Sequence, residues 1–292
     1  MATAREIQRR IRSVTNIGQV TRAMEAVSAS KMRRAQERTL ASRAYAERAW
    51  EILTYLASQP AAGEVLHPLL EERTVRNTAL LVITPDRGLC GGLPTNVIRE
   101  VVAFISRQTT PVRIVSIGRK GSDFMLRYGA DICADFSGLP DQPPLKEVTP
   151  IARLVIDQFL DGTFDQICLI YANFVNTMVQ RPVTRQLMPI EPAILEGAGA
   201  VAYTIEPDPE TVLGEVLEGF TVLQIYQAIL DAQASEHSAR MVAMRAATEN
   251  AEALVEDLTL TYNRARQEAI TKELLDIAGG AEALSKARAM TG

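Results

Sequence analysis

The feature that most constrains this chain is a heptad pattern in its last third. No Pro follows Pro209, and apolar or small residues recur in alternating steps of four and three. The seam consists of Leu230, Ala234, His237, Met241, Met244, Thr248, Ala251, Val255, Leu258, Tyr262, Ala265 and Ala269. A pattern sustained over this length indicates a coiled coil, and its small residues allow a partner helix to come close. We predict one helix from about Pro209 to Ser285.

A matching partner helix is predicted at the other end of the chain. Residues 3–58 contain no Pro and a single Gly, Gly18. Apolar residues recur in steps of three and four, at Ile7, Ile11, Val14, Ile17, Val20, Met24 and Val27. This is the period of an amphipathic helix. Because the steps average slightly less than 3.6 residues, the stripe should wind around the helix and face more than one neighbour. The helix is expected to end at residues 59–63.

Between these helices the sequence changes to short runs rich in β-branched and apolar residues. They cover residues 78–83, 112–117, 166–171 and 183–188, with a weaker run at 130–136. Helical stretches at 96–107, 121–128 and 149–160 separate most of them. This alternation predicts a mostly parallel sheet with helices on its faces. The last two runs have no helical pattern between them and should form an antiparallel hairpin at the sheet edge.

The order of these parts dictates how the terminal helices meet. Both flank one domain, so they can return to each other only as an antiparallel pair. At 1.5 Å per residue the first helix would be roughly 80 Å long and the last roughly 115 Å, so the last must overhang by about 20 residues. Lys and Arg outnumber acids in the first helix, whereas acids dominate the last. Opposite charges favour the pairing, although each exposed pair contributes little.

Neither a catalytic centre nor a metal site can be assembled from the motifs. Only two His residues occur, and His237, on the heptad seam, is interpreted as a satisfied packing residue and not as a general base. Cys90, Cys133 and Cys168 lack metal or disulfide spacing and are expected to be buried thiols. The sequence has no stretch of about 18 consecutive apolar residues, so no transmembrane helix is expected. The N-terminus lacks the apolar region of a secretory signal, so a cytosolic chain is expected.

Two glycine-rich loops follow predicted strands and have two possible interpretations. The loop at residues 84–96, TPDRGLCGGLPTN, lies where a nucleotide-binding loop would lie. It matches neither GxGxxG nor GxxxxGK[ST], so we favour a tight turn with Thr95 or Asn96 capping the next helix. Residues 118–122, GRKGS, could receive an anion but are better interpreted as a capped turn. The cationic first helix lacks interleaved aromatic residues, which argues against nucleic-acid binding.

Four segments resemble the gamma subunits of rotary F-type ATP synthases. They are residues 17–34 (IGQVTRAMEAVSASKMRR), 86–92 (DRGLCGG), 235–250 (SEHSARMVAMRAATEN) and 262–274 (YNRARQEAITKEL). The family fold is an antiparallel coiled coil of the terminal helices plus a Rossmann-like domain, a combination of α+β and α/β classes. We therefore expect three parts: an N-terminal helix at 1–60, a Rossmann-like α/β domain at 74–203 and a C-terminal helix at 207–292. The paired cysteines of the chloroplast redox insert are absent from the middle block.

This resemblance implies a rotor shaft. The coil would thread the α3β3 ring, turn with the membrane c-ring and drive the catalytic β subunits through different states. Ion flow would thereby be coupled to ATP synthesis or hydrolysis, with a part in regulating ATPase activity and proton flow. Partners would be the α, β and epsilon subunits and the c-ring. The chain would be a non-catalytic subunit, without cofactor, metal, nucleic acid or small-molecule substrate, peripheral on the cytoplasmic face of the cell membrane. The alternative is a non-rotary coiled-coil scaffold with an accessory α/β domain.

Two groups of residues are candidates for partner contacts. The resemblance implies that four residues contact a β subunit and transmit torque. They are Met24, Arg266, Gln267 and Thr271. At 100° per residue, Gln267 faces away from the seam and from the partner helix. The alternative to a torque contact is that this face of the helix is merely solvated. The apolar residues of the overhang would turn inside an apolar collar of the α3β3 ring as a bearing. They are Ile270, Leu274, Leu275 and Ile277.

Overall fold

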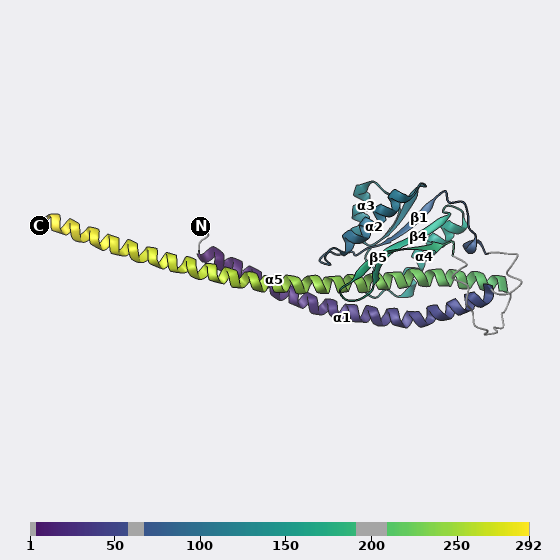
Figure 1. The fold of residues 1–292 in the computed structure, drawn as a ribbon, viewed down its shortest axis with the longest axis horizontal. Helices are drawn as coiled ribbons and strands as arrows, with labels where there is room; N and C mark the ends of the chain where they lie inside the picture. The colour runs from purple at the N-terminus through teal and green to yellow at the C-terminus, as the bar shows by residue number, and fades with distance from the viewer. Residues whose placement is uncertain (1–3, 58–66, 191–208, 292) are drawn as a thin grey trace. The chain divides into compact units, whose positions relative to one another are not determined.

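A computed structural model describes residues 4–57, 67–190 and 209–291 of the chain. The elements are, in order, α1 (Ala4–Ala57), η2 (Pro68–Leu70), β1 (Thr78–Ile83), α2 (Leu93–Arg107), β2 (Val112–Ile117), α3 (Arg119–Tyr128), β3 (Asp131–Phe136), α4 (Leu145–Leu160), β4 (Gln166–Phe174), β5 (Gln180–Met188) and α5 (Pro209–Thr291) (Figure 1). They form two compact units, residues 1–26 with 244–292 and residues 27–243. The predicted helix end at 59–63 and the stretch 191–203 lie outside the described residues.

Both long helices are confirmed, as are all five predicted strands. Helix α1 has its predicted bounds to within one residue at each end. Helix α5 begins at the predicted Pro209 and continues beyond the predicted end at Ser285 to Thr291. Strands β1 and β2 coincide with the predicted runs, whereas β4 and β5 are longer than predicted. Helix α5 runs through the Gly279–Gly280 pair without ending there.

The sheet has the order β3-β2-β1-β4-β5. Strand β1 pairs in parallel with both β2 and β4, and β2 pairs in parallel with β3. Strand β5 pairs antiparallel with β4 and forms the edge, as the sequence predicts for the last two runs. After β1 the chain forms β2 and β3 on one side of β1 and then crosses to form β4 on the other side of β1. The topological switch point therefore lies between β1 and β4.

Alternating side chains of the central strand enter two separate hydrophobic cores. Ala79, Leu81 and Ile83 pack in one core with residues of α4 and with the first part of α5, up to Ala232. Leu80 and Val82 pack in the other core with residues of α2 and α3. Helices thus cover both faces of the sheet, which is why β1 is buried along its whole length. Figure 1 shows α2 and α3 on one side of the sheet and α4 with α5 on the other.

The unit formed by both chain ends is an antiparallel helix pair. Partner numbers fall along one helix as they rise along the other: Gly18 lies opposite Ala251, and the Thr21 and Thr248 hydroxyls are 2.7 Å apart in a hydrogen bond. Glu25 accepts a 2.9 Å hydrogen bond from Arg245. A second ion pair joins Arg22 to Glu252 across the helices. The predicted antiparallel pairing and its charge complementarity are confirmed.

The face that α1 turns to its partner differs from its apolar stripe. Ile7 is buried on the helix pair, but Ile17 and Val20 are 54% and 58% exposed. Thr21 is buried instead, because the heptad register of the pair selects small residues that let the backbones approach closely. The apolar stripe leaves the seam after Val14, and Val27 at its end is 54% exposed as well. Whether a second neighbour covers it stays a prediction.

Candidate functional site

The loop after β1 closes the first turn of α3 and pairs the amide donors that an anion would need. Asp86 Oδ1 accepts from the Arg119 amide at 3.0 Å, and the Pro85 carbonyl accepts from the Lys120 amide at 3.1 Å. Thr84 Oγ1 accepts from the Gly121 amide at 2.8 Å. These are the donors that a bound phosphate would need. The anion interpretation of residues 118–122 is therefore wrong, and the turn is capped by its neighbouring loop.

Close packing of the same two loops depends on Gly118. Its φ is +100°, and a Cβ atom there would lie 1.9 Å from the carbonyl oxygen of Thr84. Asp86 adds a second contact, since its other carboxylate oxygen accepts from the Gly138 amide at 2.9 Å. The carboxylate of Asp86 thus occupies the position of an external anion. Two loops that follow different strands are held together by groups of the chain itself.

The predicted caps of α2 are wrong. The helix begins at Leu93, with Gly92 as its N-cap residue and no side-chain capping bond. Asn96 donates its amide to the Gly92 carbonyl at 3.0 Å and so lies within the first turn. Burial of Leu93 and the fixed φ of Pro94 suit the first helical turn, and both favour the earlier start.

The carboxyl edge of the sheet is covered by one segment of α5, Gln233–Arg240. Its side chains donate to backbone carbonyls near the end of β4 and in the loops that follow β1, β3 and β4. Gln233 donates to Pro140 at 2.9 Å, Ser235 to Ala172 at 2.9 Å, Ser238 to Thr177 at 2.8 Å and Arg240 to Gly88 at 3.2 Å. We call these four side chains and their carbonyl partners the edge joint. In open α/β sheets, ligands bind at this edge, next to the switch point.

The edge joint leads to a prediction about nucleotides. The full-length chain should bind neither ATP nor NAD at physiological concentrations, because a helix covers the carboxyl edge and the α3 amides are already paired. Isothermal titration calorimetry on the purified chain measures this directly. Saturable binding that is lost when Gly91 and Gly92 are replaced would contradict it and would restore the nucleotide interpretation of residues 84–96.

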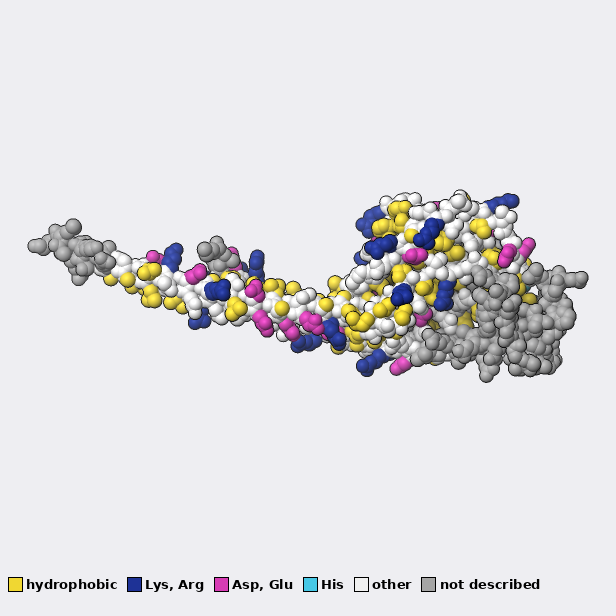
Figure 2. All heavy atoms as spheres, in the orientation of Figure 1, with side chains coloured by type: hydrophobic (Ala, Val, Ile, Leu, Met, Phe, Trp, Pro, Cys, Tyr) yellow, Lys and Arg dark blue, Asp and Glu magenta, His cyan; other side chains and the backbone are white. Residues whose placement is uncertain are grey.

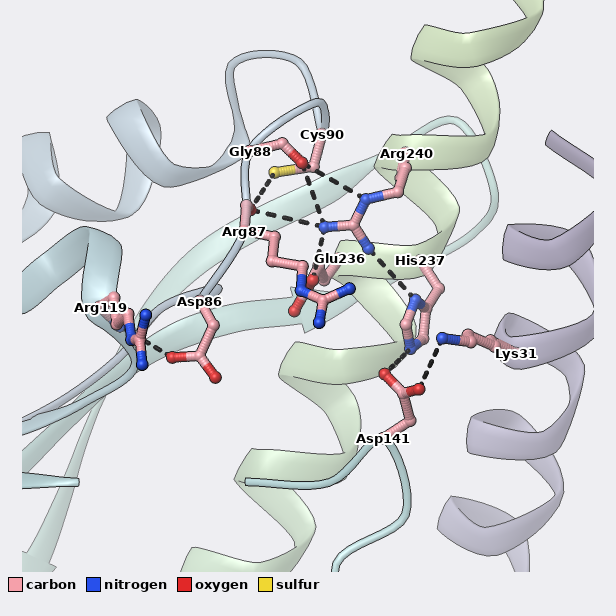
Figure 3. A network of polar contacts seen from close by, with 10 residues as sticks. All are labelled: Lys31, Asp86, Arg87, Gly88, Cys90, Arg119, Asp141, Glu236, His237 and Arg240. Atoms are coloured by element: carbon pink, nitrogen blue, oxygen red, sulfur yellow. Dashed lines mark hydrogen bonds and ion pairs between the residues drawn. The ribbon is translucent and has the colours of Figure 1, made fainter. Parts of the chain in front are cut away.

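The buried side chain of His237 lies in the middle of a polar network next to the edge joint, and the Asp141 carboxylate of this network is exposed (Figure 3). Its Nδ1 is 3.4 Å from Arg240 Nη1, and its Nε2 is 3.6 Å from Asp141 Oδ1. Lys31 of α1 forms a 2.6 Å ion pair with the same carboxylate. The interpretation of His237 as a satisfied residue is therefore wrong for Nε2, which has no hydrogen-bond partner among the described residues. Nε2 is buried and points at the Asp141 carboxylate, but the 3.6 Å distance is too long for a hydrogen bond.

Burial decides the direction of the pKa shift of His237, and Lys31 decides that of Asp141. Burial lowers the pKa of His237 to about 4, Asp141 partly opposes this, and Arg240 and Lys31 add to it. The imidazole is therefore neutral near neutral pH. Burial tends to raise the pKa of Asp141, but the hydrogen bond and charge of Lys31 outweigh it and hold that pKa below its ordinary value. The carboxylate consequently stays charged between Lys31 and a neutral imidazole.

This network makes stability depend on pH in a predictable direction. Unfolded His237 takes up a proton near pH 6.5, whereas the folded residue does so only near pH 4. The unfolded state therefore binds more protons in this window, and stability falls as the pH falls. The His237 contribution between pH 7 and 5 should be about 2 kcal/mol. Urea unfolding at both pH values should show a smaller difference for His237→Asn than for the unchanged chain. Equal differences would contradict the assignment.

The cysteines carry no reactive chemistry. Cys90 and Cys168 are buried and Cys133 is half-buried, all as free thiols. Burial raises the pKa of Cys168 to about 11 and raises those of the other two thiols above their ordinary value. The expectation of buried thiols is confirmed for Cys90 and Cys168. These thiols stay protonated at neutral pH and are poor nucleophiles.

The end of α5 presents the predicted partner contacts to solvent. The last seam residue with partial burial is Ala265, and every residue from 266 to 281 is exposed, including Arg266 and all four candidates for the bearing. Those four are 46–67% exposed: Ile270, Leu274, Leu275 and Ile277. Figure 2 shows hydrophobic side chains scattered among charged ones on this helix. The predicted overhang is confirmed, whereas the roles of these residues stay predictions.

Two of the four torque candidates share one surface feature. A shallow groove on α5 is lined by Arg264, Gln267, Glu268, Thr271, Lys272 and Leu275. Gln267 and Thr271 thus lie together, one turn apart, with Arg266 exposed beside them. Met24 is half-buried on α1. Within the described residues, no helix is long and apolar enough to cross a membrane.

Comparison with known proteins identifies the family. A family model described as ATP synthase matches residues 3–284. The ATP synthase gamma chain of Dehalococcoides mccartyi strain CBDB1 is 51% identical, covering 98% of this chain and all of the relative. The chain belongs to the ATP synthase gamma chain family. The gamma chain of Herpetosiphon aurantiacus is 49% identical with the same coverage. The family resemblance carried by the four sequence segments is confirmed.

Solved structures of ATP synthases share the gamma chain fold. The central stalk and c-ring structure of the Tetrahymena thermophila mitochondrial ATP synthase contains a chain that is 25% identical, with a TM-score of 0.61, covering 78% of this chain and 99% of that one. A chain of the Euglena gracilis mitochondrial enzyme, in the structure of OSCP, F1 and c-ring, is 19% identical, with a TM-score of 0.69 and coverages of 96% and 94%. The latter likeness concerns the fold alone. The predicted fold class is confirmed.

Proposed function

We propose that this chain is the central rotor shaft of an F-type ATP synthase. It couples ion flow through the membrane c-ring to ATP synthesis and hydrolysis at the catalytic β subunits, and it helps to regulate ATPase activity and proton flow. The observation that carries this proposal is the full-length match to gamma chains at about half identical residues. The non-rotary scaffold alternative lacks comparable support, because these full-length relatives are all ATP synthase gamma chains.

The chain itself contributes mechanics and no catalysis. Its sheet lacks a nucleotide fingerprint, and its carboxyl edge is filled by α5, so the hydrolytic sites belong to the β subunits. The helix pair formed by the two chain ends is asymmetric, and α5 extends beyond α1. Such a shaft can contact each of the three β subunits differently. Its partners are the α and β subunits, the epsilon subunit and the c-ring. The chain is a peripheral subunit on the cytoplasmic face of the cell membrane.

Two groups of surface residues carry the contacts with the ring. The torque contacts to a β subunit are Met24, Arg266, Gln267 and Thr271. The bearing comprises Ile270, Leu274, Leu275 and Ile277, four large apolar side chains that are 46–67% exposed within eight residues of α5. The bearing turns against an apolar collar in the α3β3 ring.

Co-purification tests the proposed function. The tagged full-length chain is expressed with its cognate α, β, epsilon and c subunits and is purified from detergent-solubilised membranes. We expect α and β in threefold excess over the chain, together with epsilon and the c-ring. Recovery of α and β without the c-ring would favour the scaffold alternative, and recovery of neither would contradict the proposal. The tag is not inserted in the turn between β4 and β5, because the carbonyl of Thr177 in this turn accepts a hydrogen bond from Ser238 in the edge joint.

A further inference from the structure

The edge joint connects α5 to the sheet at the switch point. Two loops border this point, one after β1 and one after β4, and α5 contacts both. Arg240 donates to Gly88 in the first loop at 3.2 Å, and Ser238 donates to Thr177 in the second at 2.8 Å. Helix α5 therefore occupies the position that a ligand takes in related sheets. Here this position holds a mechanical attachment.

Within the edge joint, Arg240 makes the most contacts. Its side chain is 11% exposed, and its Nη2 lies 2.6 Å from the Glu236 carboxylate. The same nitrogen approaches the carbonyls of Arg87 at 3.4 Å and Gly88 at 3.2 Å. Burial raises the pKa of Glu236, and the charge of Arg240 opposes that rise. A buried cation persists only when it is paired and its donors are used, so removal of the loop carbonyls or of Glu236 would leave it uncompensated.

The loop that Arg240 holds is stiff. Leu89 has φ +64°, a left-handed conformation rare for a large side chain, and Gly91 has φ +60°. Asp86 fixes the start of the loop to the Arg119 amide, and Cys90 Sγ donates to the Arg87 carbonyl at 3.7 Å. A displacement of Arg240 is therefore passed to β1 and α3 and is not absorbed by the loop. Strained backbone of this kind persists only where its surroundings impose it.

The same turn of α5 is also tied to α1. Asp141, in the loop after β3, forms the ion pair with Lys31 and faces His237 (Figure 3). Gln233 donates to the adjacent Pro140 carbonyl at 2.9 Å. All of these residues lie in the unit formed by residues 27–243. Helix α1, through Asp141, and three loops of the sheet thus converge on about two turns of α5.

We propose that Arg240 is a positioning residue for energy coupling: it locks the loop after β1 onto α5, so that the sheet and the helix turn as one body. This inference rests on the proposed function as a rotor shaft. Helix α5 continues without interruption beyond Ala243 into the helix pair, so torque applied to it reaches the sheet through the edge joint as well as through the hydrophobic core that the first part of α5 shares with β1. Without Arg240 the loop after β1 loosens from α5, and part of each rotation is lost in displacement of this loop relative to the helix.

Arg240 variants of the complete reconstituted complex test the inference. The variants are Arg240→Ala, Arg240→Gln and Arg240→Lys. The control is Arg127→Ala, because among the described residues the Arg127 side chain donates within α3, to the Asp123 carbonyl. The measurements are hydrogen–deuterium exchange of the 86–92 amides and protons pumped per ATP hydrolysed. Loss of hydrogen bonds from a charged donor predicts exchange about tenfold to a hundredfold faster in the Ala and Gln variants. Lys places a single point charge where the guanidinium reached two carbonyls, so its effect should be intermediate.

The outcomes separate this inference from the proposed function. Faster exchange with at least about a twofold lower pumping ratio, while ATP hydrolysis persists, is the expected result for Arg240→Ala. Unchanged exchange would overturn the lock, and faster exchange with an unchanged pumping ratio would overturn its role in coupling. If Arg240→Ala fails to assemble, Arg240→Lys and Glu236→Gln decide by the same measurements. Failure of the unchanged chain to copurify with α, β and the c-ring would instead contradict the proposed function.

Discussion

A chain that ends after Glu268 is expected to keep its helix pair and to lose its hold on the α3β3 ring. The seam is partly buried as far as Ala265, and residues 266–281 are all exposed, so within the described residues this truncation removes no buried part of the seam. It removes four large apolar residues, Ile270, Leu274, Leu275 and Ile277. Full burial of such a side chain in a collar contributes about 1.5–3 kcal/mol. Even partial burial of four therefore predicts retention weaker by at least about a hundredfold.

Truncation also removes Thr271, so a full-length variant is needed to isolate the bearing. Replacing the four apolar residues together with Gln keeps the helix and Thr271 but removes the apolar surface. The control replaces Leu254 and Leu260 with Gln, because both are exposed, at 46% and 61%, before the overhang begins. Dissociation of the chain from α3β3 is measured with immobilised rings, at rest and while an attached bead is turned. Equal retention of the Gln variant and the unchanged chain would contradict the bearing.

The sequence was sufficient to predict the sheet and the long helices, and the physical reason differs for each. Strand β1 is buried on both faces, so its continuous apolar run had no competing interpretation. Helix α5 carries a strict heptad over its pairing region, which only a coiled coil satisfies. The partner face of α1 was less predictable. The helices approach closely at Gly18 and Thr21, which favours small residues at the seam. A prediction from hydrophobicity alone therefore assigned Ile17 and Val20, each one position away, to the partner face.

Much less of the edge joint could be predicted. Its bonds run from side chains of α5 to backbone carbonyls, and a carbonyl is present at every residue, so no sequence pattern marks it. Ser235 and Ser238 were visible as small polar residues beside the seam. Their acceptors are the carbonyls of Ala172 near the end of β4 and of Thr177 in the loop after it, which lie 63 and 61 residues earlier in the chain. The capping of α3 by Asp86 was hidden for the same reason. Long-range pairing of this kind is settled by tertiary packing and not by local propensity.

The second large effect is expected from replacing Arg266, Gln267 and Thr271 together with Ala. All three side chains are exposed on the overhang, where they form no part of the seam. Ala is the best helix former, so the helix should survive the change. Hydrogen bonds that involve a charged partner contribute about 1.5–3 kcal/mol. If a moving loop of a β subunit engages this trio during each catalytic step, its loss should slow ATP-driven rotation and uncouple hydrolysis from pumping.

The trio must be distinguished from a merely solvated helix face, and the chain offers a matched control. Asn263, Glu273 and Asp276 are also polar and exposed on α5, and they lie outside the groove that Gln267 and Thr271 line. Their triple Ala variant should rotate and pump as the unchanged complex does, because solvated side chains lose only water contacts. Single-molecule rotation gives the torque, and proton pumping by the same preparation in vesicles gives the coupling ratio. We expect both to fall for the trio alone, with assembly unchanged. Torque and coupling equal to those of the control would show that the groove carries no load and that the force enters elsewhere on the shaft.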